Sequence, residues 1–171
     1  MAGVPPRAIE RVWSASAAAA DHAYRAARAS RVHGIADAAY LAALVHDVGI
    51  AVLLRRFPEH AGLLEEAPDD LDIAARRLDA ATGADHAAVG AMVARNWKLS
   101  PDVAEAVAMH HQPAAAREPS PATALAILIA VARRLRDGDS EEWQSWAPMA
   151  EAHLDITPPK LEELSAGTDE E

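Results

Sequence analysis

The chain has 171 residues with 16 basic and 26 acidic side chains, which give a formal net charge of −10 at pH 7. A charge of this sign argues against binding to a nucleic-acid backbone or to an anionic membrane surface. The chain contains no cysteine, which excludes disulfides and thiolate sites. The sequence shows no signal peptide and no apolar stretch of about 18 residues, so we expect a cytoplasmic protein.

The composition favours closely packed helices, because alanine dominates and aromatic residues make up only 4% of the chain. We expect an all-α bundle of about seven to nine helices, forming one domain over residues 1–166 with an acidic disordered tail at 167–171. In chain order, the sequence predicts helices over 6–31, 36–55, 58–66, 70–81 and 86–97, one from 101 that ends within 110–113, and three more over 121–136, 141–152 and 158–166.

Caps and breakers mark the ends of these helices. We expect Asp70, Asp85 and Ser100 to be N-cap residues, and Gly34 and Gly83 to follow helix C-termini. The apolar period also predicts the buried faces. Ile9, Val12, Trp13 and Ser16 share one face of the first helix. The predicted core-facing residues are Ala88, Val89, Met92 and Val93 in helix 86–97 and Trp143 and Trp146 in helix 141–152.

Residues 41–54 form the most apolar part of the chain. His46 and Asp47 lie in its middle, and the other residues are apolar or glycine, so we predict a helix that is buried on all sides. A buried carboxylate costs several kcal/mol, by rough estimate, unless it is paired, hydrogen-bonded or bound to a metal. Asp47 therefore indicates either a structural hydrogen bond or a site for a metal or phosphate.

Four of the eight histidines are candidates for a site. His86 begins a predicted helix, and His110 and His111 end another, so that at least one of the pair points inward; His46 is the fourth. Neutral imidazole with a carboxylate is a ligand set for zinc, iron or manganese, and it can equally form a hydrogen-bonded network without metal. The remaining histidines, for which we expect no functional role, are His22, His33, His60 and His153.

Four segments in this order resemble the HD superfamily. They read LVHDVG at 44–49, GADHAAVGA at 83–91, WKLSP at 97–101 and AMHHQP at 108–113. The similarity is greatest to the HDOD branch, the HD-related output domain of bacterial signalling proteins, and it also includes WxxS at 13–16 and FPE at 57–59. The resemblance covers about residues 10–136, with an extension to about 165.

The chain departs from the active enzymes of this superfamily at several positions. The resemblance implies a metal-binding His where this chain has Ala15, and a distal Asp where it has Arg133; Ile50 and Gln112 also replace the usual residues. Arg133 would repel a divalent cation, and it could pair with Asp47 or contact a phosphate. We expect Arg134 and Arg136 to be surface charges.

The resemblance leaves more than one function open. The first is a non-catalytic signalling module of bacteria that needs no cofactor and acts through a protein partner, with His46, Asp47, His86, His110 and His111 as a relic of the HD site. The alternative is a phosphohydrolase or phosphodiesterase acting on a nucleotide or cyclic dinucleotide. Its iron, manganese or zinc would be held by His46, Asp47, His86 and His110. A third option is a nucleotide-binding pocket without turnover.

The resemblance also implies a further helical lobe before the WxxS segment, which starts at Trp13. Without that lobe the first helix would expose apolar surface, so we expect that the protein can form a homo-oligomer.

Overall fold

The computed structural model describes residues 4–67, 70–116 and 118–167, and in these residues it is all-α without strands. These described residues form ten α-helices, or nine if the interrupted helix α2–α3 is counted once. Their bounds are α1 (Pro6–Ala29), α2 (Ala36–Val45), α3 (Val48–Arg56), α4 (Gly62–Glu66), α5 (Leu71–Thr82), α6 (His86–Asn96), α7 (Pro101–Met109), α8 (Pro121–Asp137), α9 (Glu141–Leu154) and α10 (Pro158–Ala166). Short 3-10 helices lie at Pro58–His60 and Pro113–Ala115.

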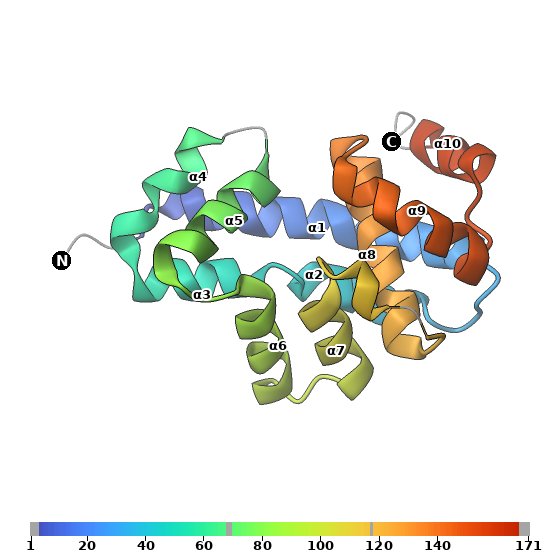
Figure 1. The fold of residues 1–171 in the computed structure, drawn as a ribbon, viewed down its shortest axis with the longest axis horizontal. Helices are drawn as coiled ribbons and strands as arrows, with labels where there is room; N and C mark the ends of the chain where they lie inside the picture. The colour runs from blue at the N-terminus through green and yellow to red at the C-terminus, as the bar shows by residue number, and fades with distance from the viewer. Residues whose placement is uncertain (1–3, 68–69, 117, 168–171) are drawn as a thin grey trace.

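Two hydrophobic cores lie along α1, which runs through the length of the molecule (Figure 1). One core contains the N-terminal part of α1 with α3, α4 and α5. The other contains the C-terminal part of α1 with α2, α7, α8, α9 and α10. The junction of α2 and α3 therefore lies where the two cores meet, and this is the position of His46 and Asp47.

The predicted helix 36–55 is interrupted at His46 and Asp47, contrary to expectation. The Nδ1 of His46 lies 2.6 Å from the carbonyl oxygen of Ala43, the oxygen that the N–H of Asp47 would use in a continuous helix. The backbone of Asp47 then turns (φ −100°, ψ 9°) before α3 begins. The break directs two polar side chains inward. The burial is also incomplete, because Val52 is 39% exposed.

The stretch Ala36–Arg56 is long and apolar enough to cross a membrane, so the expectation that no such stretch exists was wrong. However, 61% of its most apolar window is buried within the protein. Packing between the two cores accounts for its composition.

The buried face of α6 also differs from the prediction. Met92 is 66% exposed and Ala88 is exposed, whereas the residues that face inward are His86, Ala87, Gly90, Ala91 and Ala94. The inward face consists of small residues because α6 crosses α3 closely, with the α-carbon of Gly49 against the backbone of His86. On α1, Trp13 is 38% exposed, whereas Trp143 and Trp146 of α9 pack into the core as predicted.

The predicted helix starts are confirmed by side-chain caps. Asp70, Asp85, Ser100, Ser120 and Ser140 each accept a hydrogen bond from a backbone N–H in the first turn of the helix that follows. Gly83 ends α5 in the left-handed conformation (φ +67°), which glycine adopts without strain.

One of these caps gives a direct test of the helix boundaries. Ser140→Ala removes the acceptor for the N–H of Trp143, 3.0 Å away, and we expect a loss of about 1 kcal/mol of unfolding free energy in urea. The control is Ser145→Ala, an exposed position inside the same helix, which we expect to be neutral or slightly stabilising. Equal losses in the two variants would contradict the assigned start of α9.

Candidate metal centre

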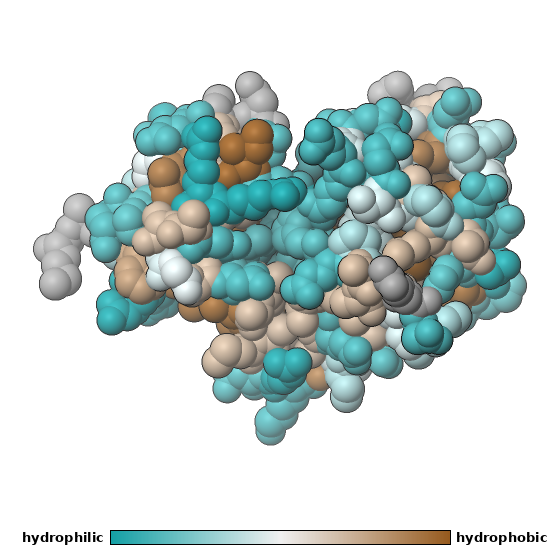
Figure 2. Space-filling model, in the orientation of Figure 1, coloured by the Kyte–Doolittle hydropathy of each residue, from teal (hydrophilic) through white to brown (hydrophobic). Residues whose placement is uncertain are grey.

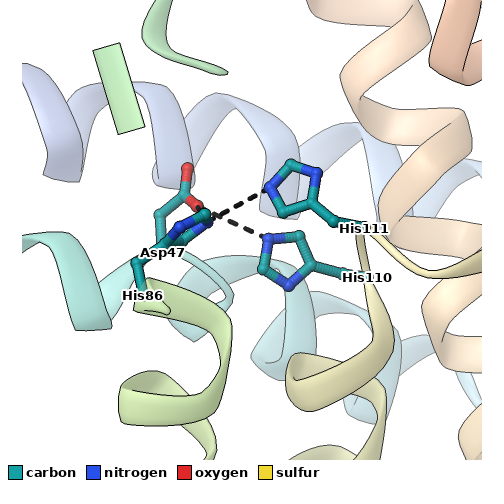
Figure 3. Close-up of side chains that lie close together, drawn as sticks. All are labelled: Asp47, His86, His110 and His111. Atoms are coloured by element: carbon teal, nitrogen blue, oxygen red, sulfur yellow. Dashed lines mark hydrogen bonds and ion pairs between the residues drawn. The ribbon is translucent and has the colours of Figure 1, made fainter. Parts of the chain in front are cut away.

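Three separate parts of the bundle bring Asp47, His86, His110 and His111 together (Figure 3). Asp47 comes from the break between α2 and α3, His86 begins α6, and the two adjacent histidines follow α7. One ligand atom from each of the four residues lies within 4.8 Å of the others. We call these four residues the Asp47 cluster.

The distances within the Asp47 cluster fit a single metal ion. The Nε2 atoms of His86 and His110 each lie 3.7 Å from Oδ1 of Asp47, and the Nε2 atoms of His86 and His111 lie 3.1 Å apart. Ligands bound at about 2.0–2.1 Å around a tetrahedral zinc are separated by about 3.3 Å. Small adjustments of the side chains would therefore complete a coordination shell.

The outer ring nitrogen of each histidine has an acceptor that fixes the tautomer. The Nδ1 of His86 is 2.7 Å from Oδ2 of Asp79, that of His110 is 2.7 Å from the carbonyl oxygen of Val107, and that of His111 is 2.9 Å from Oε1 of Glu142. Carboxylates and carbonyls accept hydrogen bonds, so each Nδ1 carries a hydrogen. In a neutral ring the Nε2 lone pair then faces the centre of the cluster, as in metal-bound histidines.

Several buried polar atoms at this site have no hydrogen-bond partner in the described part of the chain. They are Nε2 of His110, Oδ2 of Asp47 and Nε2 of His46, although the last two lie 3.1 Å apart without the geometry of a hydrogen bond. Atoms of this kind are rare in proteins, and a bound ion is one arrangement that would satisfy three of them at one place. The donor set, three imidazoles and one carboxylate, matches the nitrogen and oxygen ligands of zinc.

The electrostatics keep the cluster ready for a cation. Burial alone would raise the pKa of Asp47, but the neighbouring imidazoles of His46 and His110 outweigh it, so the pKa lies well below its usual range. Burial lowers the pKa of His111 to about 4, which keeps this ring neutral. Burial also acts to lower the pKa of His86, but hydrogen bonding to Asp79 and the charge of Asp47 raise it overall.

The observed cluster differs from the predicted metal set in one member. It contains Asp47, His86 and His110, but His111 takes the place of His46. Nε2 of His46 lies 3.1 Å from Oδ2, the other carboxylate oxygen of Asp47. Burial lowers the pKa of His46. His46 therefore contacts the carboxylate oxygen that the cluster histidines do not approach, and the His-Asp pair does not supply both ligands of this cluster.

Arg133 does not pair with Asp47 as predicted. Its guanidinium forms ion pairs with Asp72 of α5 and with Glu142 of α9, the latter at 2.8 Å. Glu142 also contacts Arg76 at 2.7 Å. Burial acts to raise the pKa of Glu142, but hydrogen bonds with His111 and Arg133 hold it well below its usual range. Because Arg133 has two carboxylates of its own, it leaves Asp47 to the histidines.

Arg136 is less exposed than expected and lies against the first helix. Its side chain is only 12% exposed, and Nη1 donates a hydrogen bond to the carbonyl oxygen of Ala15 at 3.0 Å. Its charge contributes to the lowered pKa of His46. A fixed positive charge therefore lies on the His46 side of the site. Arg134 is partly exposed and pairs with Asp139.

Sequence reasoning missed Asp79, Asp72 and Glu142, the carboxylates that hold the histidines and Arg133. Asp79 lies in the last turns of α5, seven positions before the histidine that it contacts, and Glu142 lies 31 positions after its histidine. Neither spacing follows a helical or metal-ligand period. Besides His46, four more histidines lie outside the Asp47 cluster, namely His22, His33, His60 and His153, although His22 is half-buried.

A helical bundle with a buried cluster of histidines around one aspartate belongs to a class of domains that can bind metal ions. A family model described as HDOD domain matches residues 3–113, which is more than half of the chain, and the protein therefore belongs to the HDOD family. The match includes the whole Asp47 cluster but not α8 and α9, which carry Arg133 and Glu142. Comparisons with curated proteins and with solved structures found no match.

Proposed function

We propose that this protein is a non-catalytic HDOD module that acts through a protein partner in bacterial signal transduction, and that its Asp47 cluster holds one structural divalent metal. The signalling role rests on membership of the HDOD family, and the structural metal rests on the closed ligand set. Asp47, His86 and His110 are buried, and the side chain of His111 is only 18% exposed. Four protein ligands fill the tetrahedral shell of zinc, whereas catalytic zinc sites keep one position open for water or substrate.

The surroundings of the cluster also favour a structural role. The superfamily resemblance places two further metal ligands at Ala15 and Arg133, and neither side chain can bind a metal. Arg133 and Arg136 instead bring positive charges to this region, and these disfavour a second divalent cation. A guanidinium paired with two carboxylates is also a weak candidate for binding the phosphate of a nucleotide.

A phosphohydrolase is the second candidate, and one observation favours it. Nε2 of His46 and Oδ2 of Asp47 are buried 3.1 Å apart, at the carboxylate oxygen that His86 and His110 do not approach, and neither makes a hydrogen bond of normal geometry in the described part of the chain. These two atoms would be the start of a second metal site. Two protein ligands alone make a weak site, so this candidate needs ligands from the substrate or from water.

Metal content per chain is the test. We expect about one zinc ion per chain in protein purified without chelator, and its loss in His110→Ala but not in His33→Ala, which changes an exposed histidine away from the cluster. Free zinc at 100 times its dissociation constant should stabilise the metal-free protein by about 2.7 kcal/mol. A protein that neither contains nor responds to metal would contradict the structural metal.

Hydrolysis of a simple phosphodiester separates the two candidates. The non-catalytic proposal expects no turnover by the metal-loaded protein. Turnover that disappears in Asp47→Asn, with the fold intact by circular dichroism, would instead support the enzyme. Self-association is tested separately by light scattering, in which a monomer mass at high concentration would contradict a homo-oligomer.

A further inference from the structure

The carboxylate of Glu142 lies at the outer edge of the Asp47 cluster. Its Oε1 and Oε2 atoms are 2.9 and 3.1 Å from Nδ1 of His111. Glu142 is the second residue of α9 and lies outside the segment that matches the HDOD family. This chain therefore brings a carboxylate from its C-terminal helices to a histidine of the matched segment.

Two neighbours compete for Nδ1 of His111, and they favour opposite tautomers. Glu142 is an acceptor, so a contact with it requires hydrogen on Nδ1 and leaves the lone pair on Nε2. Nη1 of Arg133 is a donor at 3.4 Å, and a bond from it would require the lone pair on Nδ1 and hydrogen on Nε2. The shorter distance, 2.9 Å to Glu142, selects hydrogen on Nδ1.

The position of Glu142 is itself fixed by two arginines. Nη1 of Arg133 lies 2.8 Å from Oε1, and Nη2 of Arg76 lies 2.7 Å from Oε2. Arg133 is anchored in turn by its ion pair with Asp72 of α5. Figure 2 shows hydrophilic surface around the hollow between the α5 and α9 sides of the molecule, and a cavity of about 110 Å³ there is lined by Asp72, Arg133 and Glu142. These contacts hold the carboxylate in one orientation.

We propose that Glu142 is a positioning residue for the Asp47 cluster. By accepting the Nδ1–H of His111, it keeps Arg133 from donating to that nitrogen and turns the Nε2 lone pair toward His86 and Asp47 as a metal ligand. The role of this lone pair in metal binding rests on the proposed function. The tautomer of His111, however, is a property of the metal-free protein and can be measured by itself.

Nitrogen-15 NMR of the imidazole side chains in metal-free protein tests this proposal. We expect hydrogen on Nδ1 of His111 in the wild type and on Nε2 in Glu142→Ala, because Arg133 then becomes the nearest partner of Nδ1. Glu141→Ala is the matched control, since it removes the same charge from the first turn of α9 at an exposed position. It should leave the tautomer unchanged.

Zinc affinity gives the second measurement. It should fall about 10- to 100-fold in Glu142→Ala, as for other residues that orient a metal-bound histidine, and remain unchanged in Glu141→Ala. Glu142→Gln retains a side-chain oxygen that accepts the Nδ1–H, so it should keep the wild-type tautomer; it also preserves the test if the alanine variant does not fold.

The outcomes separate the two proposals. If Glu142→Ala keeps hydrogen on Nδ1, or if Glu142→Gln loses it while remaining folded, the positioning role is wrong. If the wild type binds no zinc but its tautomer responds to Glu142 as expected, the positioning role stands for the ring of His111 and the structural metal is wrong.

Discussion

Replacing Gly49 with alanine is expected to destabilise the protein by more than about 3 kcal/mol, because no side chain can yield to the added atom. A Cβ at this position would lie 1.9 Å from the carbonyl oxygen of His86 and 2.9 Å from the backbone nitrogen of Gly90. Both contacts are with the backbone of α6, so the whole helix would have to move away from α3. Urea unfolding at neutral pH measures the loss of free energy.

Gly62→Ala is the matched control for this substitution. Gly62 lies at the start of α4, and a Cβ there meets nothing within 4 Å, so the gain in helix propensity of up to about 1 kcal/mol should make the change neutral or stabilising. A loss of stability in Gly49→Ala no larger than in Gly62→Ala would contradict the close crossing of α3 and α6.

The close crossing of α3 and α6 at Gly49 also determines where His86 lies. His86 is the first residue of α6, and its carbonyl oxygen is the atom that a Cβ on residue 49 would strike. Gly49 follows Asp47 by two positions, so the contact that brings α6 against α3 also brings the imidazole to the carboxylate. A folded Gly49→Ala protein would therefore be expected to lose metal affinity as well as stability.

Sequence alone predicts the helices of this protein well, because their ends depend on local chemistry. Asp70, Ser100 and Gly83 fix helix ends through interactions with residues four or fewer positions away, and such interactions are visible in a sequence. The interruption at His46 was not predicted, since it depends on a ring nitrogen that bonds to a carbonyl within an otherwise continuous apolar period.

The buried faces of the helices and the ion pairs between them were harder to predict, because both depend on which helices pack against one another. The apolar period assigned Met92 to the buried face of α6. The close approach of α3 leaves room on that face only for small residues such as Gly90 and Ala91. Similarly, Arg133 was expected to pair with Asp47, which would have compensated the buried carboxylate, or to contact a phosphate. The fold brings Asp72 and Glu142 to Arg133 from 61 and 9 positions away in the chain.

The zinc affinity of the metal-free protein is expected to rise about tenfold per pH unit between pH 5 and the pKa of His86, and to level off above that pKa. Hydrogen bonding to Asp79 and the charge of Asp47 raise the pKa of His86 above its ordinary value of 6.5. Below the raised pKa, Nε2 of His86 therefore carries a proton, which the metal must displace. As the pH rises, fewer molecules carry the competing proton on His86, so zinc affinity increases with pH.

The states of the neighbouring groups explain why the protonation of His86 should control zinc affinity between pH 5 and the pKa of His86. Asp47 has a pKa well below its usual range and is already ionised, and the pKa of His111 is about 4, so its ring is neutral above pH 5. In the metal-free protein, a proton on Nε2 of His86 also provides the donor for Nε2 of His111, 3.1 Å away. The metal takes over the position of that proton between the two rings.

Asp79→Asn distinguishes the two effects of Asp79 on His86, its negative charge and its hydrogen bond. The amide oxygen can still accept the Nδ1–H of His86, but the negative charge that helps to raise the pKa is lost. The rise in zinc affinity should therefore move to lower pH, while the affinity at pH 8 should fall, by up to about 10- to 100-fold, because the ring becomes a less basic ligand. Isothermal titration with zinc from pH 5 to 8 measures both effects. Equal affinities at pH 5.5 and 7.5 in the wild type would show that His86 holds no competing proton and is not a ligand of the metal.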